Sequence, residues 1–274
     1  MKKINTNYIK RKLYKMLPGK IRLQLMRFLL PAVEMNLDNI VFRMAETPGD
    51  YLSAFNLVYR VFLETGYIKS NRTPFRLAPQ HCHSESRVFM GLQNGGENDK
   101  LIYSISVFPD SDDGLPMDSV FKKELDLLRA NGRFIVEAGH LAADPSFKMN
   151  NMNIPMLGNK MLHQYASDHL NADDIVIAIH PRHRWIYEDL LLFKKIGAID
   201  EYSYANNNPA LAMRLDLRTV KEDCKKVYKR VKRENNLYNF FFTEKSKSII
   251  LPDQYIGIEQ RSLKNLKYFY DLRN

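Results

Sequence analysis

The stretch IVIAIHPRHRWIYEDLLLF, residues 175–193, contains the two patterns on which the fold depends. Its first five residues form an apolar run, which is typical of a strand covered on both faces. His180 and Pro181 end that run, and helical spacing from His183 to Phe193 follows, with Gly197 beyond its end. The stretch therefore predicts a central strand that leads through a polar turn into a helix.

The segments on either side repeat this alternation of strand and helix. Thr47 is expected to cap the helix that begins at Pro48, Asp118 is expected to cap another, and residues 65–86 lack periodicity and are expected to form a loop. The pattern predicts strands over 39–46, 87–93, 101–108, 134–142, 199–204 and 211–217, and further helices over 48–64, 118–128 and 154–170. We therefore expect an α/β fold with a mixed central sheet and helices on both faces.

The net charge of +10 is unevenly distributed along the 274 residues. Residues 1–33 contain nine basic and no acidic side chains, and residues 218–235 contain eight basic and three acidic ones. We expect a basic amphipathic helical segment over 1–37, a folded domain over 38–217, and an extension over 218–274. The extension would consist of a basic helix and an aromatic tail that packs on the domain.

Two cysteines and the lack of a secretory signal favour a cytoplasmic protein without a disulfide framework. The basic segments could bind an acidic protein or an anionic membrane at its inner face, or could simply be solvated helix faces. They contain few interleaved aromatic residues, so we expect no nucleic acid partner. The His81-Cys82-His83 cluster fits no common zinc spacing, and no metal is expected.

Four blocks of the sequence, at 57–68, 108–118, 136–145 and 180–198, resemble the FeeM-type N-acyl amino acid synthases of the GNAT acyltransferase superfamily. The architecture is also similar to that of acyl-homoserine-lactone synthases, in which an Arg follows a Glu by three places; here His140 follows Glu137. The resemblance implies the GNAT fold. It also implies the transfer of a long-chain fatty acyl group from an acyl carrier protein thioester to the amine of an amino acid.

The lack of a glycine-rich loop suggests which acyl donor is used. Acetyl-CoA-dependent members of the superfamily have a glycine-rich loop that binds pyrophosphate, whereas residues 147–155 contain no glycine. We therefore expect no resident cofactor and an acyl-phosphopantetheine arm as donor, with a coenzyme A thioester as the alternative. Acyl carrier proteins are acidic, so the basic helix near 221–233 and the N-terminal segment are candidate docking surfaces.

Glu137 is the expected base, because a carboxyl group in the middle of an apolar strand needs a partner or a function. The alternative is a structural ion pair with Arg60. His140 would share the face of Glu137 only if Ala138 and Gly139 formed a bulge; otherwise it is a core histidine.

The resemblance assigns further residues to the site. Tyr187 aligns with the tyrosine that superfamily members use as general acid, although core packing would also explain it. Arg60 could bind the carboxylate of the amino acid, and Arg182 and His183 lie at a strand end, where open sheets bind ligands. The remaining substrate-binding candidates are Phe62, Tyr67, Phe108 and Leu141.

Two other functions remain open at this point. One is an ordinary N-acetyltransferase that uses acetyl-CoA. The other is a non-catalytic module that uses the same fold to bind lipid or a membrane.

Overall fold

The computed structural model describes Arg27, Glu34 and residues 36–94, 99–147, 152–202 and 205–252. Most of the expected N-terminal helix, residues 148–151 of the glycine-free loop and the last aromatic residues of the tail lie outside these residues. No helix in the part of the chain that the structure describes is long and apolar enough to cross a membrane.

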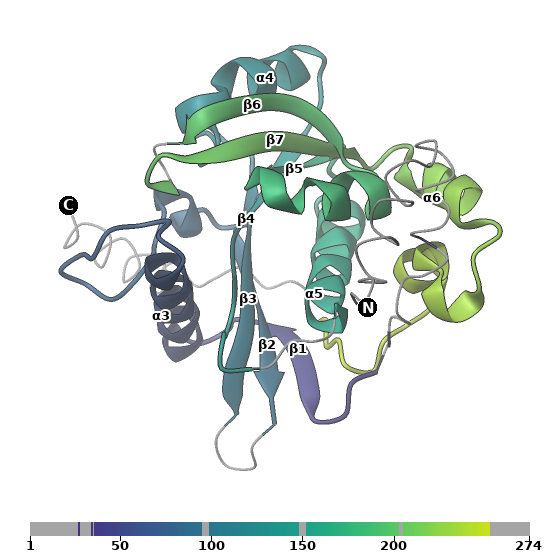
Figure 1. Cartoon of the computed structure of the whole chain (residues 1–274), viewed down its shortest axis with the longest axis horizontal. Helices are drawn as coiled ribbons and strands as arrows, with labels where there is room; N and C mark the ends of the chain where they lie inside the picture. The colour runs from purple at the N-terminus through teal and green to yellow at the C-terminus, as the bar shows by residue number, and fades with distance from the viewer. Residues whose placement is uncertain are drawn as a thin grey trace, which may run out of the picture.

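A seven-stranded sheet in the described part of the chain has the order β1-β2-β3-β4-β5-β7-β6 (Figure 1). The strands are β1 (Ile40–Met44), β2 (Arg87–Gln93), β3 (Lys100–Pro109), β4 (Ile135–Ala143), β5 (Asp174–Ile179), β6 (Lys194–Tyr202) and β7 (Asn208–Asp216). Strands β1 to β4 are antiparallel, as are β5, β7 and β6. The predicted mixed sheet is confirmed.

The two antiparallel groups meet in a short parallel pair. Strands β4 and β5 pair only from Ile135↔Asp174 to Glu137↔Val176. Beyond Glu137, β4 continues to Ala143 and β5 to Ile179 without pairing to each other. The sheet therefore splits in its middle, and Figure 1 shows the two groups of strands diverging from that point.

Helices cover both faces of the sheet (Figure 1). Helices α3 (Pro48–Glu64) and α4 (Asp118–Ala130) lie on one face, and α5 (Asn153–Gln164) lies on the other with α6 (Val220–Tyr228) nearby. Side chains of β3 alternate accordingly: Phe108 joins the cluster under α4, whereas Val107 joins the cluster under α5. Short turns complete the chain: η1 (Pro79–Cys82), η2 (Tyr165–His169), η3 (Pro181–His183), η4 (Ile186–Leu190), η6 (Arg233–Asn235) and η7 (Asn239–Thr243).

Helices α3 and α4 begin in different ways. Thr47 caps α3 through a capping box with Asp50, and Pro48 is the first helical residue, as predicted. The prediction that Asp118 caps α4 is wrong, because Asp118 is already inside the helix. Its carboxylate instead accepts the N–H of Leu115 and binds the guanidinium of Arg129.

The predicted helix over residues 183–193 is also wrong in extent. The chain forms the 3₁₀ turn η3 and then the π turn η4, and Leu192 takes a positive φ of 65° that ends the turn. Strand β6 begins at once, so Gly197 lies within a strand. A Cβ at Gly197 would stand 3.0 Å from the Glu124 carboxylate of α4, which shows how closely that helix approaches the strand.

The segment after β7 packs on the sheet. Tyr228, Leu237 and Phe240 are buried in the cluster under α5. Further along, the backbone N–H and carbonyl of Phe42 in β1 bond to Ser248 and Ile250. The described part of the expected extension therefore contributes to the core and to the sheet.

Candidate active site

Glu137 is the last residue of β4 that pairs with β5, at the point where the sheet splits, and its side chain is 4% exposed. One carboxylate oxygen accepts the backbone N–H of Met117 at 2.8 Å, at the start of α4. Burial raises the pKa of Glu137 to about 8; the Met117 hydrogen bond opposes this shift and the charge of Asp118 adds to it. A carboxyl group that titrates near neutral pH is suited to accept a proton.

The alternative ion pair between Glu137 and Arg60 does not form. Arg60 lies on the exposed side of α3, where its Nε donates to Asn56 at 3.2 Å. Among the residues that the structure describes, no cationic side chain pairs with Glu137 to explain a buried carboxylate structurally.

His140 is brought to the same site by a bulge in β4. Ser106 of β3 pairs with Gly139, but Ser104 pairs with Ala142, so β4 contains one extra residue between these positions. His140 takes a positive φ of 51°, and the bulge lies at His140–Leu141, two residues later than the expected position at Ala138–Gly139. The bulge allows His140, three residues after Glu137, to line the same pocket.

This pocket, the Glu137 pocket, has a volume of about 110 Å³ and opens where β4 and β5 separate. Four parts of the fold contribute: the end of α3 with the loop after it, β4, the end of β5, and the connection between β6 and β7. The lining residues are Phe62, Tyr67, Glu137, Ala138, Gly139, His140, Ala178, Ile179, His180, Tyr202, Ala205, Asn208, Pro209 and Ala210. The buried carboxyl of Glu137 is therefore accessible from a cavity.

The rim of the Glu137 pocket is held together across the split. Arg182, after β5, donates to the hydroxyl of Tyr67 at 3.0 Å and to His183 Nε2 at 2.9 Å. Asn208 donates to the carbonyl of Gly66, next to Tyr67. Burial, and then the charge of Arg182, lower the pKa of His183. The exposed guanidinium of Arg182 is thus a positive charge beside the pocket.

Tyr187 lies away from the Glu137 pocket, in η4 beside the cluster under α5. Its ring packs edge-on against Phe193 with centroids 5.5 Å apart. Burial raises the pKa of Tyr187 to about 12, so its hydroxyl keeps its proton at neutral pH. Leu141 also packs with the cluster under α5, and Phe108 is fully buried behind His140, with ring centroids 5.7 Å apart.

The contact between His81 and Ser106 was not expected, because His81 was considered only for metal binding and Ser106 for no function. His81, in η1, is 2% exposed; its Nε2 lies 3.0 Å from the Ser106 hydroxyl and its ring centroid 4.9 Å from that of His140. Periodicity could not find this contact, because η1 lies in a long irregular segment. Within the described ranges, His, Cys, Asp and Glu side chains form no group of three or more that could hold a metal ion.

Known proteins share both the sequence pattern and the fold. A family model for the N-acyl amino acid synthase FeeM matches residues 53–216. The solved structure of FeeM, an N-acyl amino acid synthase from uncultured soil microbes, has 26% identity and a TM-score of 0.58. That match covers 67% of this chain and 93% of that one. No curated protein matches the chain by sequence.

A second solved structure is similar in fold alone. It is BjaI, a CoA-dependent acyl-homoserine lactone synthase with SAM and isopentyl-CoA, at 12% identity and a TM-score of 0.51. The match covers 84% of this chain and 98% of that one. The match to FeeM includes β4, with its buried Glu137, and both sides of the split in the sheet. The chain therefore belongs to the FeeM family of N-acyl amino acid synthases, which are N-acyltransferases.

Proposed function

We propose that this N-acyltransferase moves a long-chain acyl group from a carrier-protein thioester to the amine of an amino acid, with Glu137 as the base. The observation that carries the proposal is a buried carboxyl that has no cationic partner in the described part of the chain and is reached by a pocket at the split between β4 and β5. Aminolysis of a thioester requires the amine to lose a proton, and Glu137, with a pKa of about 8, can take it.

The split in the sheet is the proposed place of the thioester carbonyl. Beyond Glu137, β4 has no pairing with β5, so backbone N–H groups on that side are available to a developing oxyanion. Tyr187, on the far side of the split, is the proposed proton donor to the departing thiolate. Its raised pKa keeps it protonated at neutral pH.

Arg182 is the proposed anchor for the carboxylate of the amino acid. Arg60, the first candidate, points away from the Glu137 pocket, whereas Arg182 contacts the hydroxyl of Tyr67, which lines it. A guanidinium binds a carboxylate through two parallel hydrogen bonds. An amino acid held at this rim would direct its amine into the pocket.

An acyl carrier protein is the proposed donor because of the charge after β7. Lysine and arginine side chains of α6 and the turn after it are exposed; they are Lys221, Lys225, Lys226, Lys229, Arg230 and Lys232. An acidic carrier protein would be attracted to this surface and would dock faster at low salt. A coenzyme A thioester, the alternative donor, would not need this basic surface.

A product assay tests the proposal. The purified chain is incubated with an amino acid mixture and one of three donors, dodecanoyl carrier protein, dodecanoyl-coenzyme A or acetyl-CoA, and the products are analysed by mass spectrometry. We expect N-dodecanoyl amino acids, formed faster from the carrier protein. Acetylated amines formed only from acetyl-CoA would contradict the proposal, and so would a lack of product from every donor.

A further inference from the structure

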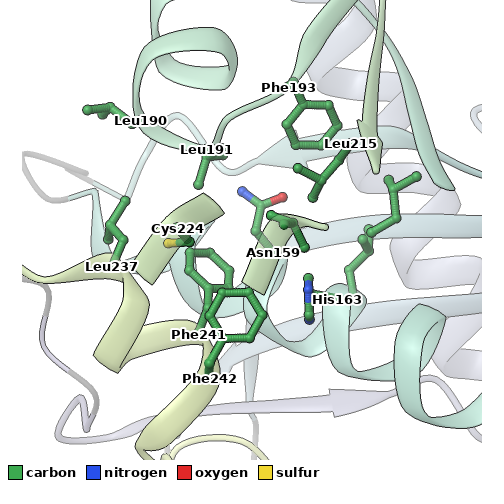
Figure 2. Close-up of a pocket in the computed structure, with 13 residues that line it drawn as sticks. Asn159, His163, Leu190, Leu191, Phe193, Leu215, Cys224, Leu237, Phe241 and Phe242 are labelled. Atoms are coloured by element: carbon green, nitrogen blue, oxygen red, sulfur yellow. The ribbon is translucent and has the colours of Figure 1, made fainter. Parts of the chain in front are cut away.

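A second cavity lies on the opposite face of the sheet from the Glu137 pocket (Figure 2). This apolar cavity has a volume of about 40 Å³ and lies between α5, η4, the start of α6 and η7. Its polar side chains are Asn159 and His163; the other lining residues are Leu162, Ile175, Leu190, Leu191, Phe193, Leu215, Val220, Cys224, Leu237, Phe241 and Phe242.

The outer wall of the apolar cavity comes from the segment after β7. Val220, Cys224, Leu237, Phe241 and Phe242 all follow residue 216, where the match to the FeeM family model ends. Figure 2 shows Phe241 and Phe242 beside Cys224, with Leu191 from η4 nearby. This chain therefore completes the cavity with residues outside the matched part of the family.

A buried lysine holds that wall in place. Lys160 of α5 is 1% exposed, and its ammonium group donates to the carbonyls of Phe240 and, at 2.8 Å, Glu244, at the two ends of η7. The same ammonium lies 5.3 Å from the centroid of the Phe240 ring. These contacts fix the turn that presents Phe241 and Phe242 to the cavity.

The apolar cavity lies close to Tyr187, the proposed proton donor, because Phe193 both lines the cavity and packs against the Tyr187 ring. Leu190, Leu191 and Phe193 follow Tyr187 within a few residues, and the Phe193 ring packs against the Tyr187 ring. A chain that extends from a thioester beside Tyr187 would therefore meet this cavity on the α5 face.

The chemistry of the lining excludes a charged ligand. Burial lowers the pKa of His163 to about 4, so its imidazole is neutral at physiological pH, and the lining contains no carboxylate, ammonium or guanidinium. A volume of about 40 Å³ holds about three water-sized groups, and a methylene group is of similar size. The cavity thus suits the end of an uncharged alkyl chain.

We propose that the apolar cavity receives the distal carbons of the acyl chain, and that the segment after β7 sets the preferred chain length. The proposal rests on the proposed acyl transfer and names its donor class, a thioester of a straight, saturated acyl chain. Each methylene that enters the cavity should favour binding about fourfold, so filling it should alter the preference for long chains by about 50-fold.

Substitution at Cys224 provides a matched pair of variants. Cys224→Phe fills the cavity and Cys224→Ala does not. Each is assayed with acetyl, hexanoyl, decanoyl and tetradecanoyl thioesters of N-acetylcysteamine. Cys224→Phe should lose about 50-fold in kcat/KM for the longest accepted chain and keep its rate with short ones, whereas Cys224→Ala should match the wild type. The same length profile in all three proteins would overturn the proposal.

Binding without catalysis separates this proposal from the proposed function. Calorimetric titration with decanoyl and hexanoyl thioesters, without an amino acid, should show tighter binding of the longer chain in the wild type but not in Cys224→Phe. That result without turnover would support the cavity and contradict the acyl transfer. Turnover without length-dependent binding would support the acyl transfer and contradict the proposed role of the cavity. If circular dichroism shows that Cys224→Phe is unfolded, Val220→Phe replaces it.

Discussion

Two buried carboxyl groups on neighbouring strands, Glu137 of β4 and Asp174 of β5, have opposite surroundings. Asp174 is fully buried and accepts hydrogen bonds from the guanidinium groups of Arg133 and Arg214. Glu137 is almost as buried, but its hydrogen-bond partner is the backbone N–H of Met117, and no lysine or arginine among the described residues forms an ion pair with it. The paired carboxylate of Asp174 therefore stabilises the fold. Burial without an ion pair raises the pKa of Glu137, which makes this carboxyl group suitable for proton transfer.

The largest effect should come from Glu137→Gln. The amide keeps the size of the side chain but cannot take a proton, so we expect kcat to fall about 10²- to 10⁴-fold while the protein stays folded. Steady-state product formation measures the loss, and circular dichroism checks the fold. The exposed Glu64→Gln is the control and should keep its activity. A Glu137→Gln enzyme within about threefold of the wild type would remove Glu137 from the mechanism.

Asp174→Asn should show the reverse pattern. Arg133 and Arg214 would lose the buried carboxylate and keep only their second shared partner, Asp216, and we expect a loss of about 3 kcal/mol in the free energy of unfolding. Urea denaturation measures it. The rate per folded molecule should stay within about twofold. Asp126→Asn, at the exposed ion pairs with Lys122 and Arg129, is the control and should change the stability much less. If Asp174→Asn instead abolished turnover in a stable protein, the contrast between the two carboxyl groups would fail.

The pH dependence of stability tests the same contrast. The pKa of Glu137 is about 8 in the folded protein, above its ordinary value of 4.5, so the folded state binds more protons between these pH values. Stability from this group is therefore complete below about pH 4.5 and is lost as pH rises towards 8, by up to about 1.4 kcal/mol per pH unit. Urea midpoints across this range should decline less steeply in Glu137→Gln. Parallel curves would show that the pKa of Glu137 is not raised.

The smallest effect should come from the rim of the Glu137 pocket. Arg182→Gln should raise KM for the amino acid about tenfold with kcat within about twofold, because the guanidinium is proposed to bind the acceptor carboxylate. Steady-state kinetics with an amino acid and with the corresponding amine that lacks a carboxylate measure this. Arg184→Gln, at an exposed pair with Glu188, is the control. An equal KM increase for the amine would contradict carboxylate recognition.

Local patterns in the sequence predicted most of the fold, because capping residues, apolar periodicity and strand composition act over a few positions. Thr47 with Pro48, and the apolar strand around Glu137, are examples. The helix expected over 183–193 ends early, because the chain turns at Leu192 and enters strand β6 at Lys194, where it pairs with β7. Propensity does not contain that information.

The candidate site was predictable only in part. Glu137 and His140 were found because polar residues stood out in an apolar strand, and both line one pocket. The contact of His81 with Ser106 joins residues distant in the chain, so no local pattern reveals it. The direction of Arg60 depended on which side of α3 faces the sheet, and the apolar cavity depended on how the segment after β7 returns to α5.

The return of residues 248–250 to Phe42 has a consequence for biosynthesis. The outer edge of β1 forms these hydrogen bonds with Ser248 and Ile250 only after nearly all of the described chain has left the ribosome. Until then the nascent sheet presents open backbone donors and acceptors, which favour pairing with another molecule. Closure between such distant positions is also intrinsically slow. A nascent chain halted before residue 248 should therefore self-associate more readily than the finished protein.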